Sequence, residues 1–434
     1  MHEKYGPILR IAPNEVTFAG EEAWSDIFQP RPDTQQQFLK DPTWWERQPG
    51  MPPSLLSAID PREHARIRKF LALGLTPRAL AAQEPMLNRY VNLLVERMHD
   101  IVTSSDEDGL GGKAEIDMTP WFNFTTFDIF GDLGFGESFG CLENSRYHPW
   151  IALLFNSVKA ASFVAAVRFY PLLKWLLMKC IPPSLKEMQR KHYNQIVDKV
   201  HRRLNWELER PDIMSHVIRG RKGDEGLEIG VINATFMVLT TAGSETTATV
   251  LSGTLNYLVN NPDKLAILTS EIRQRFKNQD EIKLDALREL EYLNVCLNEG
   301  LRLSVPIPWM LPRLVPEGGA TTAVSIQAYT LNRRPDYFHS AASFMPERWL
   351  PEASTNPASP FYHDRRQAMQ PFSTGPRNCM GQHLAWAELR LTMAKLLWNF
   401  DMEAVPRKRL RWEDLRTFLL VEKKPVHVRM RVRQ

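Results

Sequence analysis

The segment 230–259 constrains the fold most strongly, because no proline interrupts it before Asn260-Asn261-Pro262. At ~1.5 Å per residue, about 30 helical residues span roughly 45 Å, which is enough to cross a whole domain. Polar residues such as Asn233, Thr240 and Glu245 break its apolar run, so a membrane-spanning helix is disfavoured. The segment therefore predicts a buried helix through the centre of a large domain.

The rest of the chain is also mainly helical. Apolar residues recur at three-and-four spacing through much of 61–272 and again in 284–303, and a final helix follows Gly381. Strand patterns are short and lie near both ends of the chain, at 8–11, 16–18, 321–330 and about 417–431. The stretch 332–374 shows no period, and a loop of that length is usually present for function. We expect a mainly α fold with small β-sheets, in which residues 1–434 form a single large domain around a long central helix.

Charge, cysteines and the amino terminus exclude several classes of protein. Lys and Arg number 54 against 50 Asp and Glu, and a net charge of +4 gives no sign of nucleic-acid binding. The cysteines contain no C-x-x-C pair, which argues against a disulfide framework or a structural zinc site; they are Cys141, Cys180, Cys296 and Cys379. The scattered cysteines favour a reducing compartment. The start of the chain shows neither a signal peptide nor a run of 18 apolar residues, so we expect no terminal membrane anchor.

One loop delivers a cysteine to the start of a helix, in the sequence Phe372-Ser373-Thr374-Gly375-Pro376-Arg377-Asn378-Cys379-Met380-Gly381. Unpaired amide hydrogens, the positive end of the helix dipole and Arg377 all favour the thiolate form of Cys379. Gly375 and Gly381 allow the backbone to approach something flat and bulky. The alternative is a buried structural cysteine, which we accept for the other three.

The pattern F-x-x-G-x-R-x-C-x-G resembles the haem-ligand loop of the cytochrome P-450 superfamily. The resemblance extends from about Tyr5 to Pro425. Residues 5–15 and 127–136 resemble the fungal microsomal branch of the family, whose members modify secondary metabolites. It implies that Cys379 is the proximal ligand of haem b iron and that Phe372 belongs to the haem-binding loop. A thiolate ligand pushes electron density toward bound oxygen and favours O–O cleavage.

Two further motifs occur in the chain order of that family. Glu299-Gly300-Leu301-Arg302 places a carboxylate and a guanidinium on one helix face, where they can pair. Pro346-Glu347-Arg348-Trp349 follows in the long loop, and the resemblance implies that Arg348 joins the pair. We assign structural roles to Glu299, Arg302 and Arg348.

The motif Ala242-Gly243-Ser244-Glu245-Thr246-Thr247 on the long helix resembles the family's oxygen-activation motif. Gly243 would leave room for dioxygen, and a Thr hydroxyl can bond back to a carbonyl and open the helix locally. Glu245 and Thr246 would then pass protons through water to the distal oxygen, which is general acid catalysis. The alternative is an exposed polar stretch on a helix surface, which the apolar flanks disfavour.

Four basic residues are candidates for holding the two haem propionates, because buried carboxylates need cations. His64 and Arg68 share one helix face at a place where the family commonly has a propionate-binding pair. Arg313 follows the E-x-x-R helix, and Arg377 lies beside the predicted ligand. Singly, each would more often be a solvated surface charge.

The segment 150–186 contains five basic residues, no Asp or Glu, and many aromatic and aliphatic residues. Such a composition suits contact with a membrane surface without spanning it. An ordinary amphipathic core helix with solvated lysines is an equal alternative. By resemblance, we expect the cytosolic face of the endoplasmic reticulum membrane and a partner NADPH-cytochrome P-450 reductase that supplies electrons.

The function implied by the resemblance is a haem-thiolate monooxygenase that inserts one oxygen atom from O2 into a hydrophobic small molecule. A fungal secondary metabolite of terpenoid or polyketide type is the expected substrate. One alternative is a haem-thiolate isomerase or dehydratase that needs no external electrons. Another is a non-catalytic, degenerate haem-binding copy, because members of the family have a short hairpin that this sequence does not show between Ala320 and Thr321. A Cys-His hydrolase is disfavoured, since no nucleophile elbow accompanies Cys379.

Overall fold

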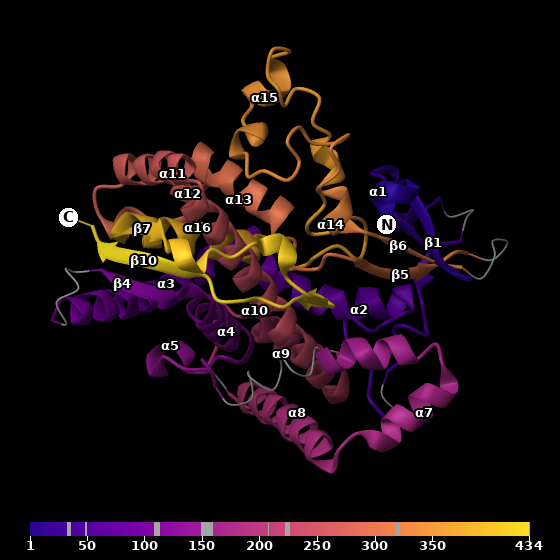
Figure 1. Cartoon of the computed structure of the whole chain (residues 1–434). Helices are drawn as coiled ribbons and strands as arrows, with labels where there is room; N and C mark the ends of the chain where they lie inside the picture. The colour runs from indigo at the N-terminus through magenta and orange to yellow at the C-terminus, as the bar shows by residue number, and fades with distance from the viewer. Residues whose placement is uncertain are drawn as a thin grey trace.

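The long helix predicted at 230–259 forms the centre of the molecule. A computed structural model describes residues 1–32, 36–47, 50–107, 113–148, 159–206, 208–221, 226–316 and 322–433. In it, α10 (Ile229–Asn260) packs against α4 (Met118–Phe135), α13 (Glu291–Leu303) and α16 (Gln382–Asn399) (Figure 1). Since α10 is covered by neighbours on several sides, its sequence is apolar on most of its circumference rather than on one stripe.

The remaining helices surround this centre. They are α1 (His2–Tyr5), α2 (Pro61–Ala72), α3 (Pro77–Glu107), α5 (Cys141–Asn144), α7 (Pro171–Cys180), α8 (Pro183–Leu204), α9 (Ile213–Arg221), α11 (Pro262–Arg275), α12 (Leu284–Arg288), α14 (Ala328–Leu331) and α15 (Glu352–Thr355), and residues 159–167 are also helical. In the long loop, η4 (Pro346–Trp349) and η5 (Arg366–Ala368) are single helical turns. The prediction of a mainly α protein is confirmed.

Three small sheets complete the fold. The largest has the order β1 (Ile8–Ala12), β2 (Glu15–Phe18), β6 (Ala323–Ile326), β5 (Met310–Leu314) and β3 (Leu39–Lys40), with only the β2–β6 pair parallel. The second has the order β4 (Ala114–Asp117), β10 (His427–Val432) and β7 (Phe400–Ala404), and the third pairs β8 (Thr417–Phe418) with β9 (Leu420–Val421). The five-stranded sheet lies to one side of the helices in Figure 1, and β5 connects it to the wall of the candidate site described below.

Two predicted elements differ from the structure. The helix expected at 284–303 is broken into α12 and α13, because the backbone N–H groups of Tyr292 and Leu293 donate to the carboxylate of Glu271 and start a new helix there. The strand expected at 321–330 is confined to β6, because its partner β2 ends at Phe18, opposite Ile326, and the chain then turns into α14.

The helices α10 and α13 approach each other through glycines. A Cβ at Gly300 would collide with the Thr254 hydroxyl, and a Cβ at Gly253 would collide with the Ser304 hydroxyl. Glycine in a helix interior costs ~1 kcal/mol relative to alanine, and here the close packing of the two helices offsets that cost. Within the described residues, no helix is both long enough and apolar enough to cross a membrane.

Candidate haem site

A cavity of about 330 Å³ lies where α10, α2, β5 and the segment before α16 meet. Its lining is mostly apolar and includes Leu55, Leu56, Phe130, Val238, Leu239, Ala242, Val250, Leu301, Pro306, Ile307, Met310, Leu311 and Leu384. No Asp or Glu is among its described lining residues, although five residues with basic side chains are: Lys40, His64, Arg68, Arg313 and Arg377. The cavity is therefore an apolar chamber with a cationic region.

Cys379 lies on the wall of this cavity, in the loop that leads into α16. Its backbone N–H donates to Phe372 O at 2.8 Å, and Gly381 is the residue at the helix start. Burial raises the pKa of the Cys379 thiol, whereas the Gly381 backbone N–H and Arg68 lower it. The helix start, as expected from sequence, and Arg68 therefore favour the thiolate, and burial opposes it.

The arginine expected to stabilise the sulfur has another role. Arg377 donates to Ala58 O and Ile59 O, both at 2.6 Å, and so joins the cysteine loop to the segment before α2. Arg68, from α2, donates to Asn378 O and Oδ1, both at 2.7 Å. Hydrogen bonds running in both directions therefore fix Cys379 in position relative to α2.

The basic residues repel one another in the absence of an anion. Burial lowers the pKa of His64 to about 3, with further lowering by Arg377 and Lys40. Burial, followed by Arg377 and Arg313, also holds the pKa of Lys40 well below its usual value. Arg313 stacks on Phe28 and has no hydrogen-bond partner for its side chain among the described residues. The region is electrostatically prepared for an anion with more than one negative charge.

Gly243 lines the cavity, but the position that its Cβ would occupy is already filled. A Cβ there would lie 2.8 Å from Phe130 Cδ2, on α4. The motif resemblance predicts that this glycine leaves room for dioxygen. The structure gives a different reason, which is the close packing of Phe130 against α10.

The two residues predicted as a proton relay face different surroundings. Thr246 lines the cavity and donates to Ala242 O at 2.8 Å, as a helix-opening threonine would. Glu245 is not among the lining residues; its buried carboxylate pairs instead with Lys423, which also donates to Thr249. The predicted Glu245–Thr246 pair is thus not brought together at the cavity, because the Glu245 carboxylate is directed to Lys423 instead.

The predicted structural motif of Glu299, Arg302 and Arg348 is present in the structure. Arg302 donates to both carboxylate oxygens of Glu299, at 2.9 and 2.7 Å, and Arg348 donates to Glu299 at 3.1 Å. Arg348 also forms an ion pair with Asp364, a contact that the sequence did not predict. These fully buried groups connect α13 to the long loop, which in turn leads to Cys379.

The sequence indicated no individual role for two residues that line the cavity, Lys40 and Thr247, or for Glu388, which is buried on α16. Lys40 had no signal, because a lysine in a two-residue strand is ordinary until the fold places it near two other cations, Arg377 and Arg313. Thr247 lines the cavity next to Thr246. Glu388 is buried in α16, and burial raises its pKa well above the usual value, against a contribution from Thr247. A Glu in an otherwise apolar helical turn, as in Ala387-Glu388-Leu389, is the one signal that was available.

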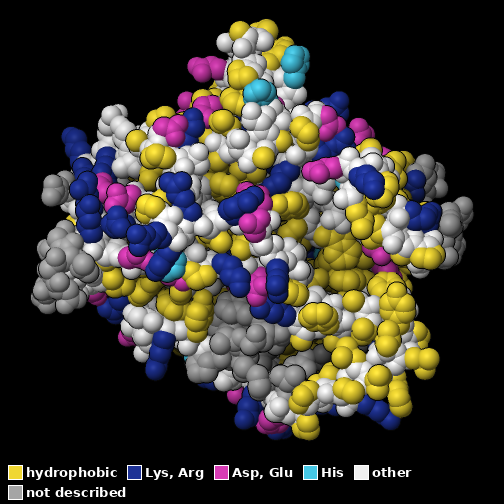
Figure 2. All heavy atoms as spheres, viewed as in Figure 1, with side chains coloured by type: hydrophobic (Ala, Val, Ile, Leu, Met, Phe, Trp, Pro, Cys, Tyr) yellow, Lys and Arg dark blue, Asp and Glu magenta, His cyan; other side chains and the backbone are white. Residues whose placement is uncertain are grey.

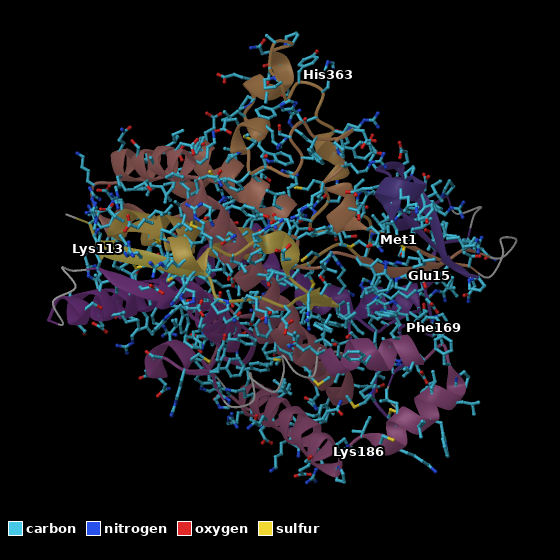
Figure 3. The ribbon with its side chains drawn as sticks, in the orientation of Figure 1. Met1, Glu15, Lys113, Phe169, Lys186 and His363 are labelled. Atoms are coloured by element: carbon cyan, nitrogen blue, oxygen red, sulfur yellow. The ribbon has the colours of Figure 1, made fainter. Side chains whose placement is uncertain are left out.

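The segment predicted to contact membranes is largely exposed. Its first part, 150–158, lies outside the described residues, and in the rest α7 has no buried residue. Figure 2 shows apolar side chains gathered over α7, and in Figure 3 the labelled Phe169 and Lys186 lie on either side of this helix along the chain. The alternative of a core helix is wrong for α7. Three of the five basic residues are paired, however: Lys159 with Glu422, and Arg168 and Lys174 with Glu46.

Comparison with known proteins identifies the family. The family model described as cytochrome P450 matches residues 1–430. The trichothecene C-4 hydroxylase of Trichoderma arundinaceum is 40% identical, over 97% of this chain and 84% of that protein. The averantin hydroxylase of Dothistroma septosporum is 37% identical, over 99% of this chain and 80% of that protein. The cytochrome P450 monooxygenase cpaH of Aspergillus oryzae is 39% identical over 95% and 79%. This chain therefore belongs to the cytochrome P450 family, and it is a monooxygenase of the fungal group within it.

Proposed function

We propose that the Cys379 sulfur would ligate the iron of a haem in the cavity and that the five basic residues would hold its propionates. One observation carries this proposal: the cysteine sulfur lines the same cavity as Lys40, Arg68, Arg313 and Arg377, and within the described residues none of these four forms an ion pair with a carboxylate. A soft sulfur suits iron, and the cations suit two carboxylates, so the donor set fits haem. When bound, haem supplies the activation of molecular oxygen.

In this proposal the basic side chains bind the propionates and the apolar side chains exclude water. Among the described residues the Arg313 side chain has no hydrogen-bond partner, so it would be the most available to bind a propionate, with His64 and Lys40 near it. Arg68 and Arg377 share their donors between the propionates and the backbone of the cysteine loop and α2 segment. Phe372 packs at the start of that loop. Val238, Leu239 and Ala242 exclude water from the side of the cavity formed by α10.

The substrate proposed is a hydrophobic small molecule, of terpenoid or polyketide type, from fungal secondary metabolism. The mostly apolar lining away from the basic region supports it, since such a wall binds carbon skeletons rather than charged groups. The names of the relatives, a trichothecene hydroxylase and an averantin hydroxylase, agree with that class. An isomerase, a dehydratase or a degenerate copy receives no support from relatives named as hydroxylases and monooxygenases.

We also propose that electrons come from NADPH through a reductase and that the protein acts at the cytosolic face of the endoplasmic reticulum membrane. Support for membrane contact comes from the exposed side chains of α7, where Leu172 is 84% and Trp175 is 59% exposed. Because most nearby cations are already paired, apolar insertion contributes more than attraction to anionic lipid. Co-sedimentation with lipid vesicles tests this: Leu172→Ser with Trp175→Ser should release the protein, and recovery of the wild type in the supernatant would contradict it.

The central experiment is spectroscopic. The reduced, carbon-monoxide-bound protein should show the strongly red-shifted Soret band of thiolate ligation, and Cys379→Ala should abolish it. Cys180→Ala, which alters an exposed cysteine on α7, is the matched control and should keep the band. A folded wild-type haem complex without the red-shifted band would overturn the assignment of Cys379.

A further inference from the structure

Glu388 is a buried carboxyl group that the proposed mechanism does not use. It lies on α16, the helix that begins just after Cys379, and its residue is 1% exposed. Thr247 is the side chain that approaches it, yet neither Oε atom has a hydrogen bond of normal geometry among the described residues. An ionised carboxylate needs several donors in an apolar setting, and this one has at most a single hydroxyl nearby.

Thr247 differs from four other hydroxyl residues of α10. Thr240, Thr246, Thr249 and Ser252 each donate to the carbonyl four residues earlier, at 2.7–2.8 Å. Thr247 makes no such bond to Gly243 O in the described part of the chain, and its side chain lies between the cavity and Glu388. Its hydroxyl hydrogen is therefore not already donated to the helix backbone.

We propose that Glu388 is a neutral carboxylic acid whose O–H donates to Thr247 Oγ1, which leaves the Thr247 hydroxyl hydrogen directed into the cavity. A neutral acid must give its proton to an acceptor, and the Thr247 oxygen is the acceptor that the fold provides. Glu388 is then a positioning residue that acts through Thr247. This rests on the proposed function only in that the cavity is the reaction chamber.

The arrangement assigns different roles to the two neighbouring threonines. Thr246 has given its hydrogen to Ala242 O, so it presents lone pairs to the cavity. Thr247 presents a hydrogen. A polar oxygen bound in the chamber thus finds one acceptor and one donor side by side on α10, and the carboxyl group that sets the donor is Glu388 rather than Glu245. Burial, which raises the pKa of Glu388 well above its usual value, agrees with the neutral form.

Infrared difference spectroscopy of the purified haem protein at neutral pH tests the proposal without requiring turnover. The wild type minus Glu388→Gln should contain the C=O stretching band of a protonated carboxylic acid, and that band should shift in deuterated water. In Thr247→Val the same band should move to higher frequency, because its hydrogen bond is lost. Thr240→Val, a buried hydroxyl residue on the same helix that bonds only to the backbone, is the control and should leave the band in place.

Two results would overturn the inference. One is a pair of ionised carboxylate bands for Glu388 in place of the acid band, and the other is an acid band that Thr247→Val does not move. If Glu388→Gln does not fold, the wild-type minus Thr247→Val spectrum decides alone.

A second readout is the product formed per NADPH consumed. Glu388→Gln, whose amide still donates a hydrogen bond to Thr247, should keep the wild-type ratio, whereas Glu388→Leu should lower it several-fold. Equal ratios in both variants would remove the positioning role, whereas failure of all product formation with the acid band intact would count against the proposed function alone.

Discussion

Arg348 Nε lies 3.1 Å from Glu299 Oε1, although the two residues are 49 positions apart in the chain and both side chains are completely buried. The contact joins η4 to α13, and Arg302 and Asp364 complete it. Removing one member of a buried ion pair leaves a charge without compensation, which typically costs 3–5 kcal/mol.

We therefore expect Arg348→Met to lower the free energy of unfolding by about 3–5 kcal/mol, because Asp364 loses the Arg348 guanidinium with which it pairs. Denaturant titration followed by circular dichroism measures this. Arg365→Ala, which removes an exposed pair with Glu21, is the control and should cost ~1 kcal/mol or less. A similar small loss in both variants would contradict the structural role of Arg348.

Lys40→Met should change two properties in opposite directions. In the haem-free chain it removes a buried cation that Arg377 and Arg313 repel, so the free energy of unfolding should rise. With haem, the same substitution removes a partner for the propionates, so haem affinity should fall. Unfolding of the haem-free protein and a haem titration measure the two effects, with exposed Lys424→Met as control. A gain in both properties would exclude Lys40 from the haem site.

The stability of the haem-free chain should decline with acidification because of His64. Its folded pKa of about 3 lies below the usual value of 6.5, so the unfolded chain takes up the proton first as the pH falls. The His64 contribution to stability is present above pH 6.5 and is lost on the way to pH 3, at about 1.4 kcal/mol per pH unit. The unfolding free energy of His64→Gln, measured over that window, should have a shallower slope than the wild type. Parallel slopes would show that His64 titrates normally; exposed His201→Gln provides the reference.

Gly243→Ala should destabilise the protein by about 1–3 kcal/mol, because its Cβ would lie 2.8 Å from Phe130. Phe130→Leu should relieve that collision, so the double variant should lose less than the sum of the two single changes. A double-mutant cycle of thermal unfolding measures the coupling. Additive losses would mean that Phe130 does not explain the glycine.

How far the sequence predicts this molecule depends on the range of the interaction concerned. The ends of α10, the start of α16 and the Glu299–Arg302 pair follow from local spacing, and the structure has them as expected. The partner of Glu245 does not, because Lys423 lies 178 positions away and no period in the sequence relates the two. Lys40 is similar: its importance comes from Arg313 and Arg377, which only the folded chain brings near it. Glu271, which divides the helix expected at 284–303, is another long-range cause.

The glycine contacts between α10 and α13 restrict the order in which this chain can change. Gly300 faces the Thr254 hydroxyl, and Gly253 faces the Ser304 hydroxyl, so each helix carries the small residue that the other requires. Alanine at 300 becomes tolerable only after Thr254 has been replaced by a smaller residue, and the same holds for 253 and Ser304. During evolution, Thr254 or Ser304 must therefore become smaller before the facing glycine can become larger. That first substitution leaves a cavity and lowers the stability of the fold, which favours retention of both glycine–hydroxyl pairs.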